Sequence, residues 1–364
     1  MKVLEIISSL DPTGGAETFA VNFSIEMQHI SDLKVVVLYR KHKDYFEEKL
    51  KENNVDYIFL NKAKRFDLKN VKELRQIIKE YKPDVIHTEN NALIPTFLAL
   101  RMLKKAQRPN VFHTMHLKAE DETSSKIVRI LFKHIFKKPN FIPVAITKSL
   151  AIESQNFYKV NYVPYVENGV SLEPFRTDKP LISRTYDVVV VGRFAPQKNH
   201  FFVVSSFLEL KKKIPNLRVA LVGGGELLDD VKKYVSDNNA QDFINFTGIL
   251  NSPADIVNDS KIIALGSLFE ANPLSLLEGM SAGCIVVSSN VGGVADIIKE
   301  GKNGFLFNSG DKDKFVEILS EILSNVENYQ NMSGFNVDYS NKFSMKECAR
   351  KYSELFGENL VPRK

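Results

Sequence analysis

The sequence predicts an α/β protein made of two doubly wound domains, each built on a parallel sheet. Short apolar runs alternate with longer stretches of helical period, and this alternation restarts once, near residue 187. Repeated strand–helix–strand order makes the strands parallel, and the four valines at 188–191 suit a strand that is covered on both faces. A polar stretch at 174–186, with Pro174 and Pro180, separates the halves, so the 364 residues divide into two domains.

Each expected element follows from local composition and period. Val, Ile and Phe dominate the strand runs, whereas apolar residues recur every three or four positions in the helical stretches. In the first half we expect strands at 2–8, 33–39, 57–59, 85–87, 111–114 and 141–146, and helices at 17–28, 44–52, 70–81 and 91–103. In the second half we expect strands at 187–191, 218–222, 244–246, 261–265, 285–288 and 304–307, and helices at 200–213, 227–238, 273–282, 313–326 and 343–356.

The composition excludes several classes of protein. Apolar residues make up 44% of the chain and charged residues 26%, which fits neither a disordered nor a collagen-like chain. No uncharged apolar run approaches the ~18 residues that span a bilayer, and Glu5 lies where a signal peptide would be apolar. Cys284 and Cys348 form neither a disulfide framework nor a metal-ligand spacing. We therefore expect a cytoplasmic protein.

Positive charge is concentrated in the first half. Residues 1–180 carry 29 Lys and Arg against 22 Asp and Glu, and residues 101–148 alone carry 11 against 3. Such a field favours an anionic partner, which could be a nucleic acid, a membrane surface or a phosphorylated substrate. A solvated basic face without a partner remains the alternative.

Ligands of doubly wound sheets bind at the carboxyl ends of the strands, so the residues that follow each strand carry the functional information. Gly14 and Gly15 follow the first strand and precede a helix, where backbone N–H groups can approach an anion. Arg193 and Lys198 follow a buried strand and could converge on one diphosphate. Gly224 lies in a glycine turn between strand and helix. Ordinary turns and a solvated loop are the alternatives for these segments.

The most specific pattern is a pair of glutamates around a helix start. Glu270 lies in the loop after the strand at 261–265, and Glu278 lies one and a half turns into the following helix. Carboxylates accept hydrogen bonds from sugar hydroxyls, and the free N–H groups of a helix start suit a phosphate. Pro273 suits the first helical position. The alternative is two acids on an exposed helix.

These residues carry a family resemblance. Glu270 and Glu278, with seven residues between them, resemble the E-x7-E signature of the family 4 retaining glycosyltransferases (group 1), which have the GT-B fold of two Rossmann-like domains facing each other across a cleft. Further segments match in order: 14–17 (GGAE), 84–87 (DVIH), 114–116 (TMH), 168–170 (NGV), 192–199 (GRFAPQKN), 246–248 (FTG), 291–293 (VGG) and 303–305 (NGF). The resemblance covers nearly the whole chain.

The resemblance implies roles for individual residues. Glu278 would hold the ribose hydroxyls, Glu270 would contact the donor sugar, and His116 would lie beside that sugar as a second catalytic residue. The nucleotide-sugar site would also contain Gly14, Gly15, Arg193, Lys198, Gly224, Asn272, Pro273, Leu274 and Ser275.

The resemblance also implies a division of labour between the domains. It assigns the acceptor to domain 1–178 and the nucleotide sugar to domain 179–340, with the helix in 341–364 crossing back to the first domain. Three positions depart from the family pattern. Asn272 stands where an aromatic or small residue is common, Ser171 replaces an aspartate, and Glu89 stands where a second histidine is frequent.

The expected activity is transfer of a hexose or an N-acetylhexosamine, with retention, from a nucleotide-diphosphate sugar to a glycan or lipid-linked acceptor in surface polysaccharide assembly. We expect a donor linked to UDP rather than to GDP, and no other cofactor, no nucleic acid and no metal. The one Asp-x-Asp triplet, Asp311-Lys312-Asp313, suits a helix start. A nucleotide-sugar 2-epimerase and a non-catalytic nucleotide-sugar-binding protein remain alternatives.

A basic amphipathic helix from Ser124 to Lys138 suggests peripheral contact with anionic lipid at the inner face of the cell membrane. Thr123 or Ser124 would cap it. The expected apolar face holds Ile127, Val128, Leu131, Phe132, Ile135 and Phe136, and the expected basic face holds Lys126, Arg129, Lys133 and Lys137. The alternative is that the lysines merely face water.

Overall fold

The computed structural model describes residues 1–10, 15–39, 45–60, 68–123, 125–250, 252–270 and 273–359. Contacts divide the chain into two compact units. Unit 1 comprises Met1–Gly169 and Met345–Lys364, and unit 2 comprises Val170–Ser344. Each unit contains a six-stranded sheet in which all the pairings are parallel, which confirms the predicted fold class of two doubly wound α/β domains.

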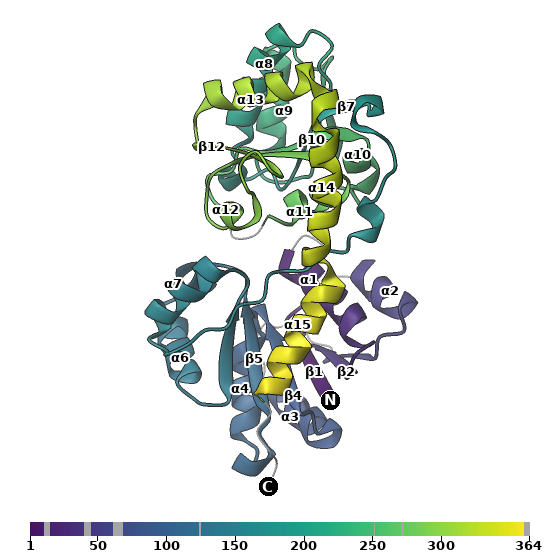
Figure 1. The fold of residues 1–364 in the computed structure, drawn as a ribbon. Helices are drawn as coiled ribbons and strands as arrows, with labels where there is room; N and C mark the ends of the chain where they lie inside the picture. The colour runs from purple at the N-terminus through teal and green to yellow at the C-terminus, as the bar shows by residue number, and fades with distance from the viewer. Residues whose placement is uncertain are drawn as a thin grey trace. The chain divides into compact units, whose positions relative to one another are not determined.

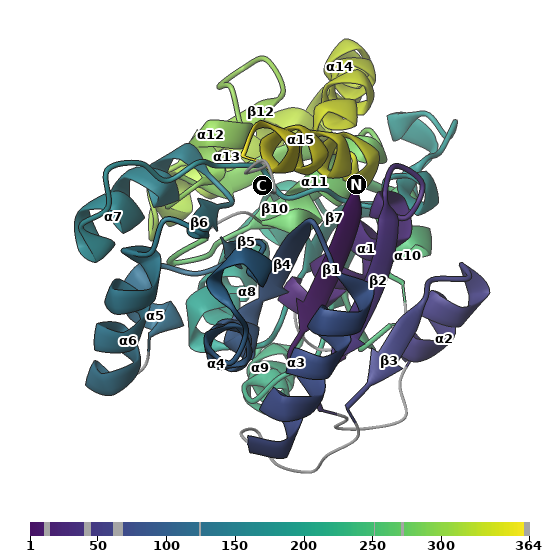
Figure 2. The ribbon, with the colours of Figure 1, turned by 90° about the horizontal axis from the view of Figure 1, so that it is seen from below.

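The sheet of unit 1 has the strand order β3-β2-β1-β4-β5-β6, and Figure 2 shows these strands side by side. Its strands are β1 Lys2–Ile7, β2 Asp32–Val37, β3 Tyr57–Phe59, β4 Val85–Glu89, β5 Asn110–Met115 and β6 Phe141–Ala145. Its helices are α1 Gly15–Met27, α2 Tyr45–Glu52, α3 Leu68–Tyr81, α4 Leu93–Arg101, α5 Ala119–Glu122, α6 Lys126–Phe136, α7 Lys148–Tyr158 and α15 Met345–Glu358.

Helices α1, α2 and α15 supply the apolar core on one side of this sheet. Phe19 and Phe23 of α1 pack with Tyr352 and Phe356 of α15 over buried strand residues such as Val35. The last helix of the chain therefore belongs to unit 1, although the segment before it belongs to unit 2.

The sheet of unit 2 has the order β12-β11-β10-β7-β8-β9. Its strands are β7 Tyr186–Val191, β8 Val219–Val222, β9 Ile244–Gly248, β10 Ser260–Leu265, β11 Ile285–Ser289 and β12 Gly304–Phe307. Its helices are α8 His200–Lys213, α9 Leu228–Asp237, α10 Ala254–Asn258, α11 Leu274–Ser281, α12 Val294–Ile297, α13 Lys312–Ser324 and α14 Gln330–Ser340. Helices α8 and α13 lie side by side, and α11 packs against α14 (Figure 1).

In both sheets, the order in which the chain adds strands reverses at an equivalent place. In unit 1 the chain leaves β1 toward β2 on one side and β4 toward β5 on the other, and β7 and β10 form the same pair in unit 2. The carboxyl ends of these two strand pairs are the topological switch points where doubly wound sheets bind ligands. The loops after β1, β4, β7 and β10 therefore position a candidate site in each unit.

Helix α6 departs from its prediction at both ends. It runs from Lys126 to Phe136, and its cap is the Ser125 hydroxyl, which accepts the Val128 N–H (3.2 Å); Ser124 lies outside the described residues. Phe132, Ile135 and Phe136 are buried, as expected, because α6 packs on β6 and α7.

The two faces of α6 also differ from the predicted faces. Ile127, expected to be packed, is 79% exposed, and Ile130 is 69% exposed. Conversely, the cationic groups of Arg129 and Lys133 lie 5.2 Å and 4.6 Å from the centre of the Phe157 ring on α7. These two cations are therefore partly covered, and the exposed surface of α6 is a mixture of isoleucine and lysine. No helix among the described residues is long and apolar enough to cross a bilayer.

Candidate active site

The loops after β7 and β10 meet through an ion pair. The Nζ of Lys198 donates to Oε1 of Glu270 at 2.6 Å, and the Ser267 hydroxyl donates to the same oxygen at 2.5 Å. The Glu270 side chain is only 7% exposed and that of Lys198 20%. Burial strengthens such a pair because less water screens it. Two predicted site residues from separate loops are thus in direct contact.

Gln197 holds the same two loops together. Its amide donates to the Phe269 carbonyl (2.7 Å), and its backbone carbonyl accepts the Leu268 N–H (2.8 Å). Arg193, at the start of the β7 loop, is exposed, and no ion-pair partner is found for it within the part of the chain that the structure describes. It is therefore available to an anion.

Glycines let neighbouring backbones approach these loops closely. Gly292 has a φ of +55°, and a Cβ there would lie 1.9 Å from the Glu270 carbonyl, which also accepts the Gly293 N–H (2.8 Å). Gly223 has a φ of +138° and would clash with the Gly192 carbonyl at 2.1 Å. A side chain at either position would displace a site loop. The glycine turn around the predicted Gly224 thus packs on the β7 loop.

Glu278 lies on α11 and is half-buried. Desolvation raises the pKa of its carboxyl to about 7. The carboxylate makes no hydrogen bond or ion pair to the residues that the structure describes. Pro273 is the N-cap of α11, rather than the first helical residue as expected, and supplies no side-chain cap to Leu274 and Ser275. Among the described residues, the start of α11 therefore has no side-chain cap, and the Glu278 carboxylate has no hydrogen-bond or ion-pair partner.

His200 is buried against the loop that follows β7. Its ring stacks on Phe194 with a centroid distance of 4.0 Å and is 1% exposed. Burial, with a smaller contribution from the charge of Lys198, lowers the pKa of His200 to about 4, so the ring is neutral. The sequence pattern placed His200 only at a helix start.

In unit 1, His116 follows β5 and lies beside a buried polar network. Its Nε2 contacts Oε2 of Glu89, and its ring meets Phe19 edge to face at 5.3 Å. On the neighbouring strand β4, Nδ1 of His87 lies 2.6 Å from Oε2 of Glu5, and Nε2 of His87 lies 3.6 Å from Oε1 of Glu89. Carboxylates and imidazoles therefore alternate.

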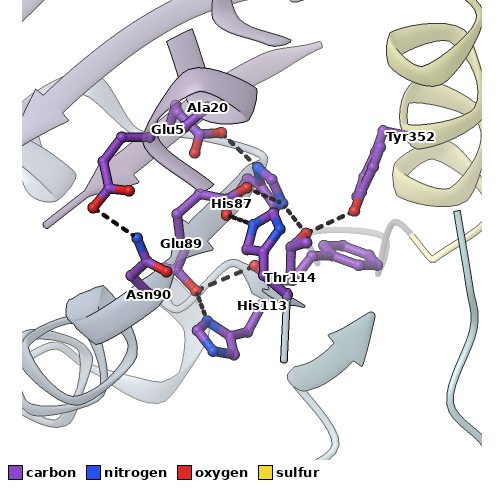
Figure 3. Close-up of polar contacts among 12 residues, drawn as sticks. Glu5, Ala20, His87, Glu89, Asn90, His113, Thr114 and Tyr352 are labelled. Carbon is purple, nitrogen blue, oxygen red and sulfur yellow. Dashed lines mark hydrogen bonds and ion pairs between the residues drawn. The ribbon is translucent and has the colours of Figure 1, made fainter. Parts of the chain in front are cut away.

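The network ends on the last helix. Nε2 of His87 also lies 2.7 Å from the Thr114 hydroxyl, which lies 2.7 Å from the hydroxyl of Tyr352 on α15 (Figure 3). Ligand atoms of Glu5, His87 and Glu89 lie within 4.8 Å of one another, a spacing that could hold a cation. Glu5 and the Thr114 hydroxyl already engage both nitrogens of His87, however, so this ring has no nitrogen left for a cation.

His113, which lies on β5 three residues before His116, is fully buried. Its Nδ1 lies 2.9 Å from the Thr88 hydroxyl, and its ring packs against Phe132 and Phe136 of α6. It therefore belongs to the packing beneath α6. Asp311, from the Asp-x-Asp triplet, caps α13 by accepting the Lys314 N–H (3.0 Å), which confirms the predicted helix start.

The predicted site is divided between the units. Unit 1 holds His116 and Gly15, the first residue of α1, and no heavy atom of the described residues lies within 4 Å of a Cβ built at Gly15. Gly14 and Asn272 lie outside the described residues. Unit 2 holds the remaining predicted residues, namely Arg193, Lys198, Gly224, Glu270, Pro273, Leu274, Ser275 and Glu278.

Sequence reasoning missed Ser267 and the deeper network of unit 1. Glu5 carried a usable signal, because an acid in the middle of a strand buried on both faces requires a buried partner. The identity of that partner, His87, depends on the β1–β4 pairing, which places Glu5 opposite His87.

Two family models match the chain. The model described as Glycosyltransferase Family 4 matches residues 13–174, and the model described as Glycosyl transferases group 1 matches residues 173–335. Together they cover residues 13–335, which is most of both units.

Characterised relatives are also similar. UDP-Gal:alpha-D-GlcNAc-diphosphoundecaprenol alpha-1,3-galactosyltransferase of Escherichia coli is 27% identical, over 77% of this chain and 76% of its own. Poly(ribitol-phosphate) alpha-N-acetylglucosaminyltransferase of Staphylococcus aureus is 23% identical, over 93% of this chain and 68% of its own. Among solved structures, HepE of Anabaena, crystallised with UDP and with UDP-glucose, superposes with a TM-score of 0.81 at 16% identity, over 98% and 100% of the two chains. This likeness confirms the predicted GT-B fold.

Proposed function

The chain belongs to the family 4, group 1 glycosyltransferases, and from that premise we propose that it moves a sugar from a UDP-linked donor to a glycan or lipid-linked acceptor, with retention of configuration, in surface polysaccharide assembly. The observation that carries the proposal is the Lys198–Glu270 pair, together with Glu278 and the start of α11, for which no side-chain partner is found within the described ranges. The galactosyltransferase relative, named for a diphosphoundecaprenol-linked acceptor, supports the lipid-linked alternative, and the HepE complexes support UDP as the carrier.

The chemistry divides between charge and hydroxyl recognition. Departure of a nucleoside diphosphate leaves negative charge, which Arg193, Lys198 and the N–H groups at the start of α11 are suited to stabilise. Glu278 would accept the ribose hydroxyls and Glu270 those of the donor sugar. We therefore propose that the reaction needs no divalent metal.

The test is product analysis with purified protein. It is incubated with a panel of UDP- and GDP-sugars, with and without a lipid-diphosphate sugar acceptor, and with or without EDTA. Mass spectrometry should find a lengthened acceptor from a UDP-sugar, and EDTA should leave the yield unchanged. NMR of the product should find the donor's anomeric configuration. Free sugar or an altered nucleotide sugar formed without acceptor would instead identify an epimerase.

Membrane contact is the remaining part of the proposal. Lys126, Ile127, Ile130 and Lys137 are exposed on α6. Apolar side chains flanked by lysines suit the interface of an anionic bilayer. We propose that α6 places unit 1 at the inner face of the cell membrane, where a lipid-linked acceptor would be found.

A further inference from the structure

Acids and imidazoles alternate in a row of four buried or nearly buried side chains in unit 1. Its members are Glu5 on β1, His87 and Glu89 on β4, and His116 after β5. The side chains of Glu5, His87 and Glu89 are not exposed at all, whereas that of His116 is 10% exposed. Only His116 among the four therefore reaches the surface of the unit. The other three are placed to act through it.

The charge of Glu89 needs compensation because a fully buried carboxylate is strongly disfavoured when unpaired. The titratable groups around it come from its own strand and from four other elements. His87 lies at 3.6 Å on its own strand, with Glu5 of β1 behind it, and His116 contacts it from the end of β5. Helix α15 contributes Cys348 and Tyr352, and α1 contributes Glu17, which accepts from the neighbouring Asn90 (3.2 Å).

The groups from α15 carry no charge near neutral pH. Burial raises the pKa of Cys348 to about 12 and that of Tyr352 well above its usual value, and the charge of Glu89 adds to both shifts. For His87, burial opposes the charged form, but the charge and hydrogen bond of Glu5, followed by the charge of Glu89, outweigh it and raise the pKa. The positive charge that lies beside Glu89 is therefore supplied by an imidazole, that of His87.

We propose that Glu89, kept ionised by the Glu5–His87 pair behind it, is a positioning residue that fixes the proton on Nε2 of His116 and holds this ring in its charged form for the transfer reaction. The inference rests on the proposed function and deepens it. A histidine at position 89, frequent in the resembling family, would supply no negative charge between the two imidazoles.

The arrangement predicts two opposite shifts in a pH profile. Without the carboxylate in Glu89→Gln, His116 loses its proton at lower pH, so the alkaline limb of kcat moves down by about one unit or more. Without Glu5, burial makes His87 neutral near neutral pH. Glu89 then takes up a proton at higher pH in Glu5→Gln, so the acid limb moves up. Because these groups titrate together, each limb reports an apparent pKa of the whole network and not of one residue.

The experiment measures kcat from pH 5.5 to 9, the Kd of UDP by calorimetry, and ¹⁵N NMR titration of histidine-labelled protein, with the His116 signal assigned from His116→Gln. Tyr352→Phe is the matched control, because it removes a buried hydroxyl of the same network without changing a charge. We expect Glu89→Gln to lower kcat at pH 8 at least tenfold, to move the His116 titration down and to leave the UDP Kd within twofold. Tyr352→Phe should change neither the His116 titration nor either limb of the pH profile of kcat.

Two outcomes would overturn the inference. One is an unchanged His116 titration in Glu89→Gln. The other is a fall in kcat with both limbs in place, which would indicate structural damage only. The NMR titration does not need turnover. If His116 responds to Glu89 but no sugar is transferred by the wild-type protein, the proposed function fails while the coupling stands.

Discussion

At the scale of single residues, Lys198 contacts one anion, Glu270, and lies where the proposed function requires it to meet a second. Lys198 pairs with the carboxylate expected to meet the donor sugar, and it lies in the loop expected to meet the diphosphate. Lys198→Ala removes a charge-assisted hydrogen bond worth about 1.5–3 kcal/mol, so donor-dependent kcat/KM should fall at least tenfold.

A matched control separates this effect from the loss of any ion pair. Lys261 makes a comparable contact to Asp187 (2.7 Å), with a side-chain exposure of 19%, but at the opposite end of β10. Steady-state kinetics of Lys261→Ala should stay within about twofold of wild type. If Lys198→Ala and Lys261→Ala lowered kcat/KM equally, the assignment of Lys198 to the site would be wrong.

Glu278 should make both stability and nucleotide affinity depend on pH. Its pKa of about 7 lies above the ordinary value of 4.5, because burial disfavours the carboxylate. The folded protein therefore binds more protons than the unfolded chain between these values, and stability falls as pH rises through this window. Glu278→Gln should raise the melting temperature at pH 8 and have little effect at pH 4.5, as measured by calorimetry.

The same carboxyl should weaken UDP binding in acid. Ribose hydroxyls donate to the ionised form, so the affinity of the wild-type protein should decrease below pH 7, beyond any change caused by titration of UDP itself. Glu278→Gln should bind more weakly at pH 8 and lack this added dependence. Glu270→Gln should reduce turnover more than UDP affinity. If Glu270→Gln alone loses UDP, the two roles are reversed.

Residues at strand ends could be singled out from sequence because turn chemistry and charge spacing are local. Arg193, Glu270 and Glu278 were identified in this way. Ser267 and Glu5 were not, because their roles depend on partners that only the folded loops and the β1–β4 register bring together.

At the scale of elements, Gly169 fixes the position of α15 in unit 1. A Cβ at this position would lie 2.6 Å from the Cα of Met345 and 2.7 Å from Cβ of Cys348. The contact is with the backbone of Met345, which cannot rotate away as a side chain can. Gly169→Ala should therefore displace α15 and lower the free energy of unfolding by about 1–3 kcal/mol, as overpacking of a core does. Calorimetry should record a lower melting temperature.

Gly334 gives the control within another helix. A Cβ there meets no heavy atom of the described residues within 4 Å, and the residue lies inside α14. Gly334→Ala should be neutral or stabilising by up to about 1 kcal/mol, since alanine favours the helix. A loss of stability equal to that of Gly169→Ala would contradict the steric account.

All twelve strands were predicted because buried parallel strands are continuous apolar runs, whose signal does not depend on their neighbours. The longer helices α7 and α14 were missed, as were the short helices α5, α10 and α12. Helix α14 contains an internal Gly334 and buries small polar groups such as Ser333 and Asn336, so it lacks an apolar stripe. Asn336 donates to the Cys284 carbonyl (2.8 Å), a partner 52 residues away that no local pattern identifies.

At the scale of the whole molecule, charge distinguishes the two halves of the chain. The excess of basic residues lies before residue 181, whereas residues 181–364 carry 20 Lys and Arg against 22 Asp and Glu. A uniform surface would bind anions without preference, but this distribution confines any electrostatic attraction to one part of the protein. Binding to an anionic bilayer would therefore orient the molecule and should decrease with salt.

Helix α6 separates the electrostatic part of this binding from the apolar part. The exposed Lys126 and Lys137 should each contribute about 1 kcal/mol near anionic lipid, while burial of Ile127 and Ile130 should add attraction that salt does not screen. Vesicles of neutral lipid, with and without an added anionic lipid, are sedimented with the protein at low and high salt. Lys126→Glu with Lys137→Glu should abolish the preference for anionic vesicles.

Ile127→Ser with Ile130→Ser should weaken binding to anionic vesicles about equally at both salt concentrations, because it removes only apolar contact. Arg129→Gln with Lys133→Gln is the matched control, since both cations already lie against Phe157 and contribute less to the outer surface. Vesicle binding that ignores lipid charge, or that depends on Arg129 and Lys133 alone, would place the contact elsewhere on unit 1. No binding to any vesicle would mean that the acceptor is met in solution.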